Sequence, residues 1–72
     1  MDVHDDFFCV GDQVLQIGVE GLGRLEGFHY VIGIIEGKLM LSRSPGGIPL
    51  KDLHDEPRLY TPTKFRRVIR AA

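Results

Sequence analysis

Short apolar segments, separated every few residues by glycine or proline, dominate the hydrophobic pattern of this chain. The segments are rich in β-branched and aromatic residues, a composition typical of strands. Alanine occurs only at positions 71 and 72, while nine glycines and four prolines interrupt the rest of the chain, so long helices are not expected. The pattern therefore predicts an all-β fold.

The strongest predicted strand is "FHYVIGII", residues Phe28–Ile35. Both of its faces are largely apolar, which favours a central position in the sheet, and Gly33 is expected to mark a bend or bulge. The "EG" pair at 36–37 predicts a tight hairpin turn leading into a second arm, "KLMLS", at Lys38–Ser42.

The flanking segments give weaker signals. "FFCV" at 7–10 is expected to form a first strand, and "VLQI" at 14–17 a second extended piece after a "GD" turn. The glycine-rich segment 18–27 is interpreted as a flexible loop. Segment 48–57 is ambiguous between a loop and one helical turn.

The C-terminal part predicts a short strand at 58–60, one tight helical turn and a closing strand at 66–70. Pro62 suits the first position of that turn and Thr61 suits its cap. Together these elements predict that residues 1–72 form one small SH3-like barrel of about five strands, with the helical turn before the last strand. The expected core comprises Phe8, Val10, Val14, Tyr30, Ile32, Ile34, Leu39, Leu41, Phe65 and Val68.

The net charge of −1 hides a strong asymmetry along the chain. Residues 1–36 carry a net charge of −6 and residues 37–72 a net charge of +5. Such a division is compatible with nucleic-acid contact at the basic end, with pairing of acidic and basic segments inside one sheet, or with attraction between copies. The sequence leaves these three interpretations open.

Four short motifs resemble small, largely uncharacterised accessory proteins of bacteriophages and prophages. The matching stretches are "FCVGD" (8–12), "EGFHYVIGI" (26–34), "GKLML" (37–41) and "YTPTKFRRV" (60–68). The resemblance implies an SH3-like barrel and a phage or mobile-element context, and it implies no activity.

Catalytic and metal-binding motifs are not evident. Cys9 lies between Phe8 and Val10 and is expected to be a buried, inert core residue. The three histidines, His4, His29 and His54, are twenty-five residues apart each time, which is no metal-ligand spacing. We therefore expect no cofactor, no metal and no enzymatic activity, except for an active site formed only in an oligomer.

The basic C-terminal segment is the first candidate interaction site, through Lys64, Arg66, Arg67 and Arg70. The aromatic residues Tyr60 and Phe65 lie nearby in the sequence and could stack on the bases of a nucleic acid. The pI of about 6.2, however, is low for a dedicated nucleic-acid-binding domain. The second candidate is an exposed apolar face that includes Val31, Ile35 and Met40, for a partner or an oligomer.

These observations favour a non-enzymatic accessory protein that binds a host or phage protein, for example as an inhibitor of a host factor. The alternative is a nucleic-acid-binding barrel that uses the basic C-terminal strand. No apolar run is long enough to span a bilayer, and the N-terminus is acidic, so a cytoplasmic location in the host cell is expected. A homo-oligomer is left open.

Overall fold

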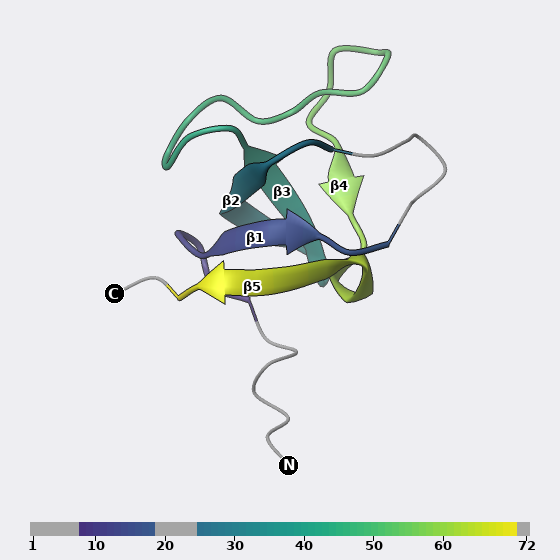
Figure 1. Ribbon diagram of the computed structural model, residues 1–72. Coiled ribbons are helices and arrows are strands. Elements are labelled where there is room, and N and C mark those ends of the chain that lie inside the picture. Colours follow the sequence, from purple (N-terminus) through teal and green to yellow (C-terminus); the bar gives the residue numbers. More distant parts are fainter. Residues whose placement is uncertain (1–7, 19–24, 71–72) are drawn as a thin grey trace.

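The computed structural model describes residues 8–18 and 25–70 of the chain. They form one antiparallel sheet of five strands, with a single 3-10 turn before the last strand (Figure 1). In chain order the elements are β1 (Gln13–Gln16), β2 (Phe28–Ile35), β3 (Lys38–Ser42), β4 (Leu59–Tyr60), the 3-10 turn η2 (Pro62–Lys64) and β5 (Phe65–Ile69). The predicted all-β class, with one helical turn before the closing strand, is confirmed.

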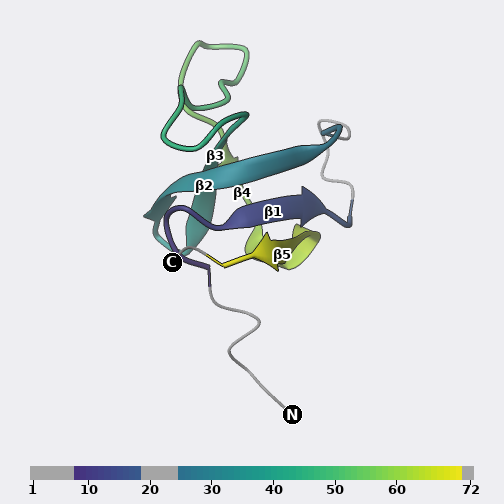
Figure 2. The same ribbon diagram turned by 60° about the vertical axis from the view of Figure 1, so that its left-hand side comes forward.

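The strands are ordered β4-β3-β2-β1-β5, so β2 is central, as predicted. The sheet coils, and β3 and β4 run across the direction of β1 and β5 in both views (Figures 1 and 2). The core lies between these two pairs of strands. The turn η2 connects β4 to β5, with Pro62 at its start as predicted, although Thr61 makes no side-chain cap hydrogen bond.

The hairpin of β2 and β3 has the predicted boundaries and turn. Glu36 and Gly37 have φ angles of 51° and 78°, the positive pair that a two-residue hairpin turn requires. Glycine adopts this conformation without steric cost, whereas glutamate does so less readily. Pairing shifts register between Val31 and Gly33, which confirms the predicted irregularity at Gly33.

The predicted first strand at 7–10 is wrong for its described part, and Phe7 lies outside the described residues. The chain instead turns from Cys9 to Asp12, where the Asp12 N–H donates to the Cys9 carbonyl at 3.0 Å. The Asp12 Oδ2 in turn accepts the Cys9 N–H at 2.8 Å. Gly11, with φ at 101°, allows this turn, so the segment bends where a strand would continue.

Six buried hydrophobic side chains form the core: Val14, Val31, Leu39, Leu41, Tyr60 and Phe65. Phe8, Leu25 and Leu50 are partly buried and pack against them. The rings of Tyr60 and Phe65 meet edge to face, with centroids 5.5 Å apart. The predicted core positions at Val14, Leu39, Leu41 and Phe65 are therefore confirmed.

Other core predictions are wrong: Val10, Ile34 and Val68 are exposed, and Tyr30 and Ile32 are only half-buried. Val31, which had been assigned to an exposed partner face, is 1% exposed and belongs to the core. The pairing of Val14 with His29 directs His29 and Val31 inward. Because β2 is apolar on both faces, its sequence does not determine which face is buried.

Four polar residues are buried beside this core: Asp12, Gln16, His29 and Ser42. The Gln16 Oε1 accepts the N–H of Leu25, which fastens the returning end of the β1–β2 connection to β1. The Ser42 hydroxyl donates to the Ser44 carbonyl at the start of the β3–β4 connection. The buried Gln16 therefore holds one connection to the sheet, while the buried Ser42 fixes only the first residues of the other.

Candidate functional site

A row of exposed side chains crosses the three strands β2, β1 and β5. Leu15 of β1 pairs with Phe28 on one side and with Arg66 on the other. Residues directly opposite one another in an antiparallel sheet project to the same face. Phe28 is 51% exposed, and Leu15 and Arg66 are also exposed, so the row presents an aromatic ring, an aliphatic chain and a cation to solvent.

A second row continues this face along the same strands. Gln13 pairs with Tyr30 and with Ile69, and the Gln13 Nε2 donates to the Tyr30 hydroxyl at 3.0 Å. Ile69 is exposed and Tyr30 is half-buried. We call these two rows, Phe28, Leu15, Arg66, Tyr30, Gln13 and Ile69, the outer face.

Arg67, predicted to be part of a basic binding surface, has a side chain that is instead largely buried. It pairs with the buried Val14, and its side chain is only 10% exposed. Its Nη1 lies 4.0 Å from the Oδ2 of Asp12, whose side chain is fully buried. This pair links the acidic first half of the chain to the basic second half. It is an example of the pairing between acidic and basic segments that was one of the three interpretations of the charge asymmetry.

The other three predicted basic residues are not equivalent. Arg66 and Arg70 are exposed, while Lys64 is half-buried in η2. The Lys64 carbonyl accepts the N–H groups of Ile17 and Gly18, and its side-chain stem lies against Gly18, where a Cβ would stand 2.9 Å from Cδ. A hollow of about 290 Å³ beside them is lined by Ile17, Phe65, Arg66 and Arg67. The structure therefore places Arg66 at the junction of this hollow and the outer face.

The predicted apolar partner face, Val31, Ile35 and Met40, does not form as a unit. Val31 is in the core, Ile35 is exposed beside the hairpin turn, and Met40 is half-buried opposite Gly33. The outer face, which is instead built around Phe28 and Leu15, was missed. The sequence did contain a sign of this face, because Phe28 and Leu15 are large apolar residues next in sequence to His29 and Val14, which point inward. Only the strand register shows that Phe28 and Leu15 lie side by side.

Other candidate chemical groups are scattered. Cys9 is exposed, which corrects its predicted burial, because the turn at Gly11 carries it away from the core. His29 is buried, and burial lowers its pKa below the ordinary value of 6.5. Residues 8–18 and 25–70 contain no group of three or more His, Cys, Asp or Glu side chains that could hold a metal ion. His4 lies outside the described residues.

Within the described residues, no helix has the length and apolar character needed to cross a membrane. Searches for similar proteins returned no matching family model, no matching curated protein and no matching solved structure. The geometry of the site is thus the basis for any functional argument.

Proposed function

We propose that this protein is a non-enzymatic binding module of a bacteriophage or other mobile element, and that it acts by contacting another protein, for example a host factor that it inhibits. The observation that carries the proposal is the exposed row of Phe28, Leu15 and Arg66 on one sheet face. Aromatic side chains and arginine are enriched in protein interfaces and dominate their binding energy. A small domain gains nothing in stability by exposing such residues together.

The proposal includes an SH3-like barrel as the scaffold and the host cytoplasm as the location. The coiled sheet with β5 beside β1 and a 3-10 turn before β5 supports that scaffold. The thiol of Cys9 is exposed and is the only one in the chain, which suits a reducing compartment.

The test is quantitative affinity capture from a lysate of the host with three forms of the chain. Phe28→Ser removes the aromatic ring of the outer face, and Ile48→Ser removes a still more exposed apolar side chain from the β3–β4 connection. We expect a specific set of proteins bound by the wild type and by Ile48→Ser but lost with Phe28→Ser. If every captured protein binds all three forms alike, the outer face is not the binding surface and the proposal fails.

Nucleic-acid binding is the second candidate, and one observation favours it. Arg66 stands on the same face as the exposed ring of Phe28, an arrangement on which a base could stack beside a backbone phosphate. The interior position of Arg67 removes one cation from this surface. Fluorescence anisotropy with labelled single-stranded and duplex oligonucleotides tests it, because binding should weaken with salt and in an Arg66→Ala, Arg70→Ala variant. No change in anisotropy at low salt would eliminate this candidate.

A further inference from the structure

The β3–β4 connection contains a folded protrusion at residues 49–58, which lies away from β1 and β5 (Figure 1). Lys51 forms an antiparallel bridge with Pro57, and the Arg58 N–H donates to the Leu50 carbonyl at 2.8 Å. The Leu50 N–H donates in turn to the Leu41 carbonyl in β3, also at 2.8 Å. The protrusion is therefore attached to the sheet at its base.

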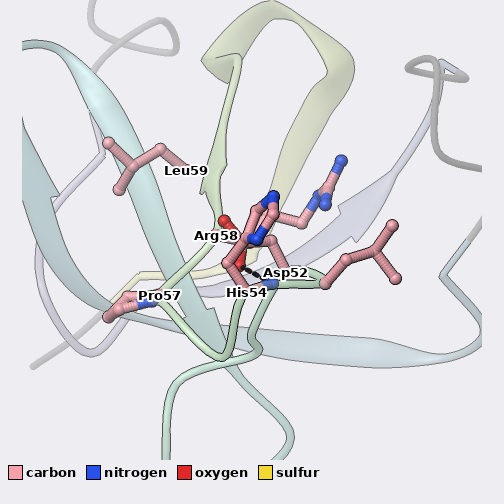
Figure 3. A pocket seen from close by; sticks show the side chains of 6 residues that line it. Asp52, His54, Pro57, Arg58 and Leu59 are labelled. Atoms are coloured by element: carbon pink, nitrogen blue, oxygen red, sulfur yellow. Dashed lines mark hydrogen bonds between the residues drawn. The ribbon is translucent and has the colours of Figure 1, made fainter.

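Asp52 fixes the tip of this protrusion. Its Oδ1 accepts the N–H group of His54 at 2.8 Å (Figure 3). The same oxygen accepts the N–H group of Glu56 at 3.1 Å. The next acid, Asp55, forms an ion pair with Lys51 at 3.4 Å. Asp52 and Asp55 are thus both engaged by groups other than Arg58.

A hollow of about 490 Å³ lies against this tip, lined by Asp52, Leu53, His54, Pro57, Arg58 and Leu59 (Figure 3). Ligand sites in proteins commonly have volumes of about 300–1,000 Å³, apolar walls and a few polar groups. Leu53, Pro57 and Leu59 supply apolar walls here. Leu53 is 94% exposed, so its aliphatic side chain is open to a ligand at the hollow.

Arg58 is the cation of this hollow. Its guanidinium carbon lies 5.7 Å from the ring centroid of Tyr60, which is buried in β4, so the cation rests on a fixed aromatic surface. Among the described residues it has no ion-pair partner. An arginine held in this way keeps a planar set of N–H donors for a carboxylate, which it can bind through two parallel hydrogen bonds.

The surrounding charges restrict the ligand further. Asp52 lines the hollow, and Asp55 and Glu56 follow it in the same turn, so these acids disfavour a polyanion such as nucleic acid, or a phosphate dianion, more strongly than a single carboxylate. A single carboxylate next to an aliphatic side chain matches both Arg58 and the apolar walls. In a polypeptide, only the C-terminal residue carries a carboxylate and its side chain on the same carbon atom.

We propose that this hollow binds the C-terminus of a partner polypeptide that ends in a branched aliphatic residue, with Arg58 holding the carboxylate and Leu53, Pro57 and Leu59 enclosing the side chain. This inference rests on the proposed protein-binding function and supplies a second, chemically defined contact for it.

The test is a titration of the ¹⁵N-labelled full chain, followed by amide chemical shifts. The probe is N-acetyl-L-leucine, and the matched probe is its neutral amide. We expect the acid to shift the amides of Leu53, His54 and Arg58, and the neutral probe to bind about 10- to 100-fold more weakly, the range for one charge-assisted hydrogen-bonded contact. Arg58→Gln should abolish the response and Arg58→Lys should weaken it, whereas Arg66→Gln should leave it unchanged.

Equal responses to the acid and its amide, an unchanged response in Arg58→Gln, or stronger binding of inorganic phosphate at the same amides would each overturn the inference. Dispersed amide spectra of both Arg58 variants check that they remain folded. The Phe28→Ser variant separates the two proposals, because it should retain the response to N-acetyl-L-leucine. If the titration fails while protein capture still depends on Phe28, only the proposal for the hollow is rejected. If the titration succeeds while capture does not depend on Phe28, only the proposal for the outer face is rejected.

Discussion

The pair formed by the buried Asp12 and the largely buried Arg67 allows the sharpest test of how the chain is held together. The Asp12 side chain is fully buried, and its Oδ2 both accepts the Cys9 N–H at 2.8 Å and lies 4.0 Å from the Arg67 Nη1. Replacing Asp12 by alanine removes the acceptor of the turn and leaves the guanidinium without this counter-charge. Breaking a buried ion pair from one side typically costs about 3–5 kcal/mol.

The separation of 4.0 Å is long for an ion pair, and the Arg67 side chain keeps 10% exposure, so the lower end of that range applies. We expect Asp12→Ala to lower the free energy of unfolding by about 3 kcal/mol. A domain of 72 residues has a total stability of about 4–11 kcal/mol, so this single change removes a large part of it. The melting temperature should fall by about 12–24 °C.

The assay is urea unfolding followed by far-ultraviolet circular dichroism, since the chain has no tryptophan to serve as a fluorescence probe. With a slope of about 1 kcal/mol per molar urea, the midpoint should move by about 3 M. Arg66→Met is the matched control, because Arg66 is the neighbouring arginine on the exposed face, and its cost should stay within about 0.5 kcal/mol.

A double-mutant cycle with Asp12→Ala and Arg67→Met then isolates the interaction. We expect the two changes together to cost about 1–2 kcal/mol less than the sum of the single changes, within the range found for residues in contact. Strict additivity, or a cost below about 1 kcal/mol for Asp12→Ala, would refute the assignment of Arg67 to the interior network.

Three further predictions concern stability. Burial, which outweighs a hydrogen bond to the Gly27 backbone, lowers the pKa of His29 below 6.5, so near this pH the unfolded chain binds more protons than the folded chain. The melting temperature should therefore fall as the pH drops through 6.5. His29→Gln should reduce this loss between about pH 7.5 and 5.5, and an unchanged pH dependence would contradict the prediction. Glu36→Asn should raise the free energy of unfolding by about 0.5 kcal/mol, because asparagine adopts the φ of 51° more readily than glutamate. The melting temperature should then rise by about 2–4 °C, and a lower melting temperature would count against the turn geometry. Leu41→Ala in the fully buried core should lower the free energy of unfolding, measured with urea, by about 2–5 kcal/mol. Leu53→Ala at the exposed tip should change it by less than about 0.5 kcal/mol, and similar losses at both sites would contradict the burial assignments.

Much of the fold could be predicted from local signals. The β2–β3 hairpin followed from two apolar segments on either side of "EG", and the turn before β5 followed from the position of Pro62, because both depend on neighbours in the sequence. The buried face of β2 could not be predicted. Both of its faces are apolar, and the choice depends on pairing with a distant strand and on the shift between Val31 and Gly33.

The candidate site was harder to predict for the same reason. The basic segment was correctly identified as part of the closing strand, but alternation alone could not show that Arg67 meets a buried acid that precedes β1. Phe28 and Leu15 lie on different strands, and only the register places them beside Arg66. The hollow at Arg58 depends on the Asp52 turn, in a segment where the sequence left the conformation open.

The pairing of β1 with β5 has a consequence for the order of folding. The hairpin of β2 and β3 closes a loop of two residues, Glu36 and Gly37, whereas β5 must find β1 across most of the chain. The entropic cost of closing a loop grows with its length, so contacts between distant strands slow the search for the native state. We therefore expect the hairpin to form first and β5 to dock late, with the Asp12–Arg67 pair completed only after the folding barrier has been crossed. Mutations at this pair should then mainly accelerate unfolding and leave the rate of folding almost unchanged.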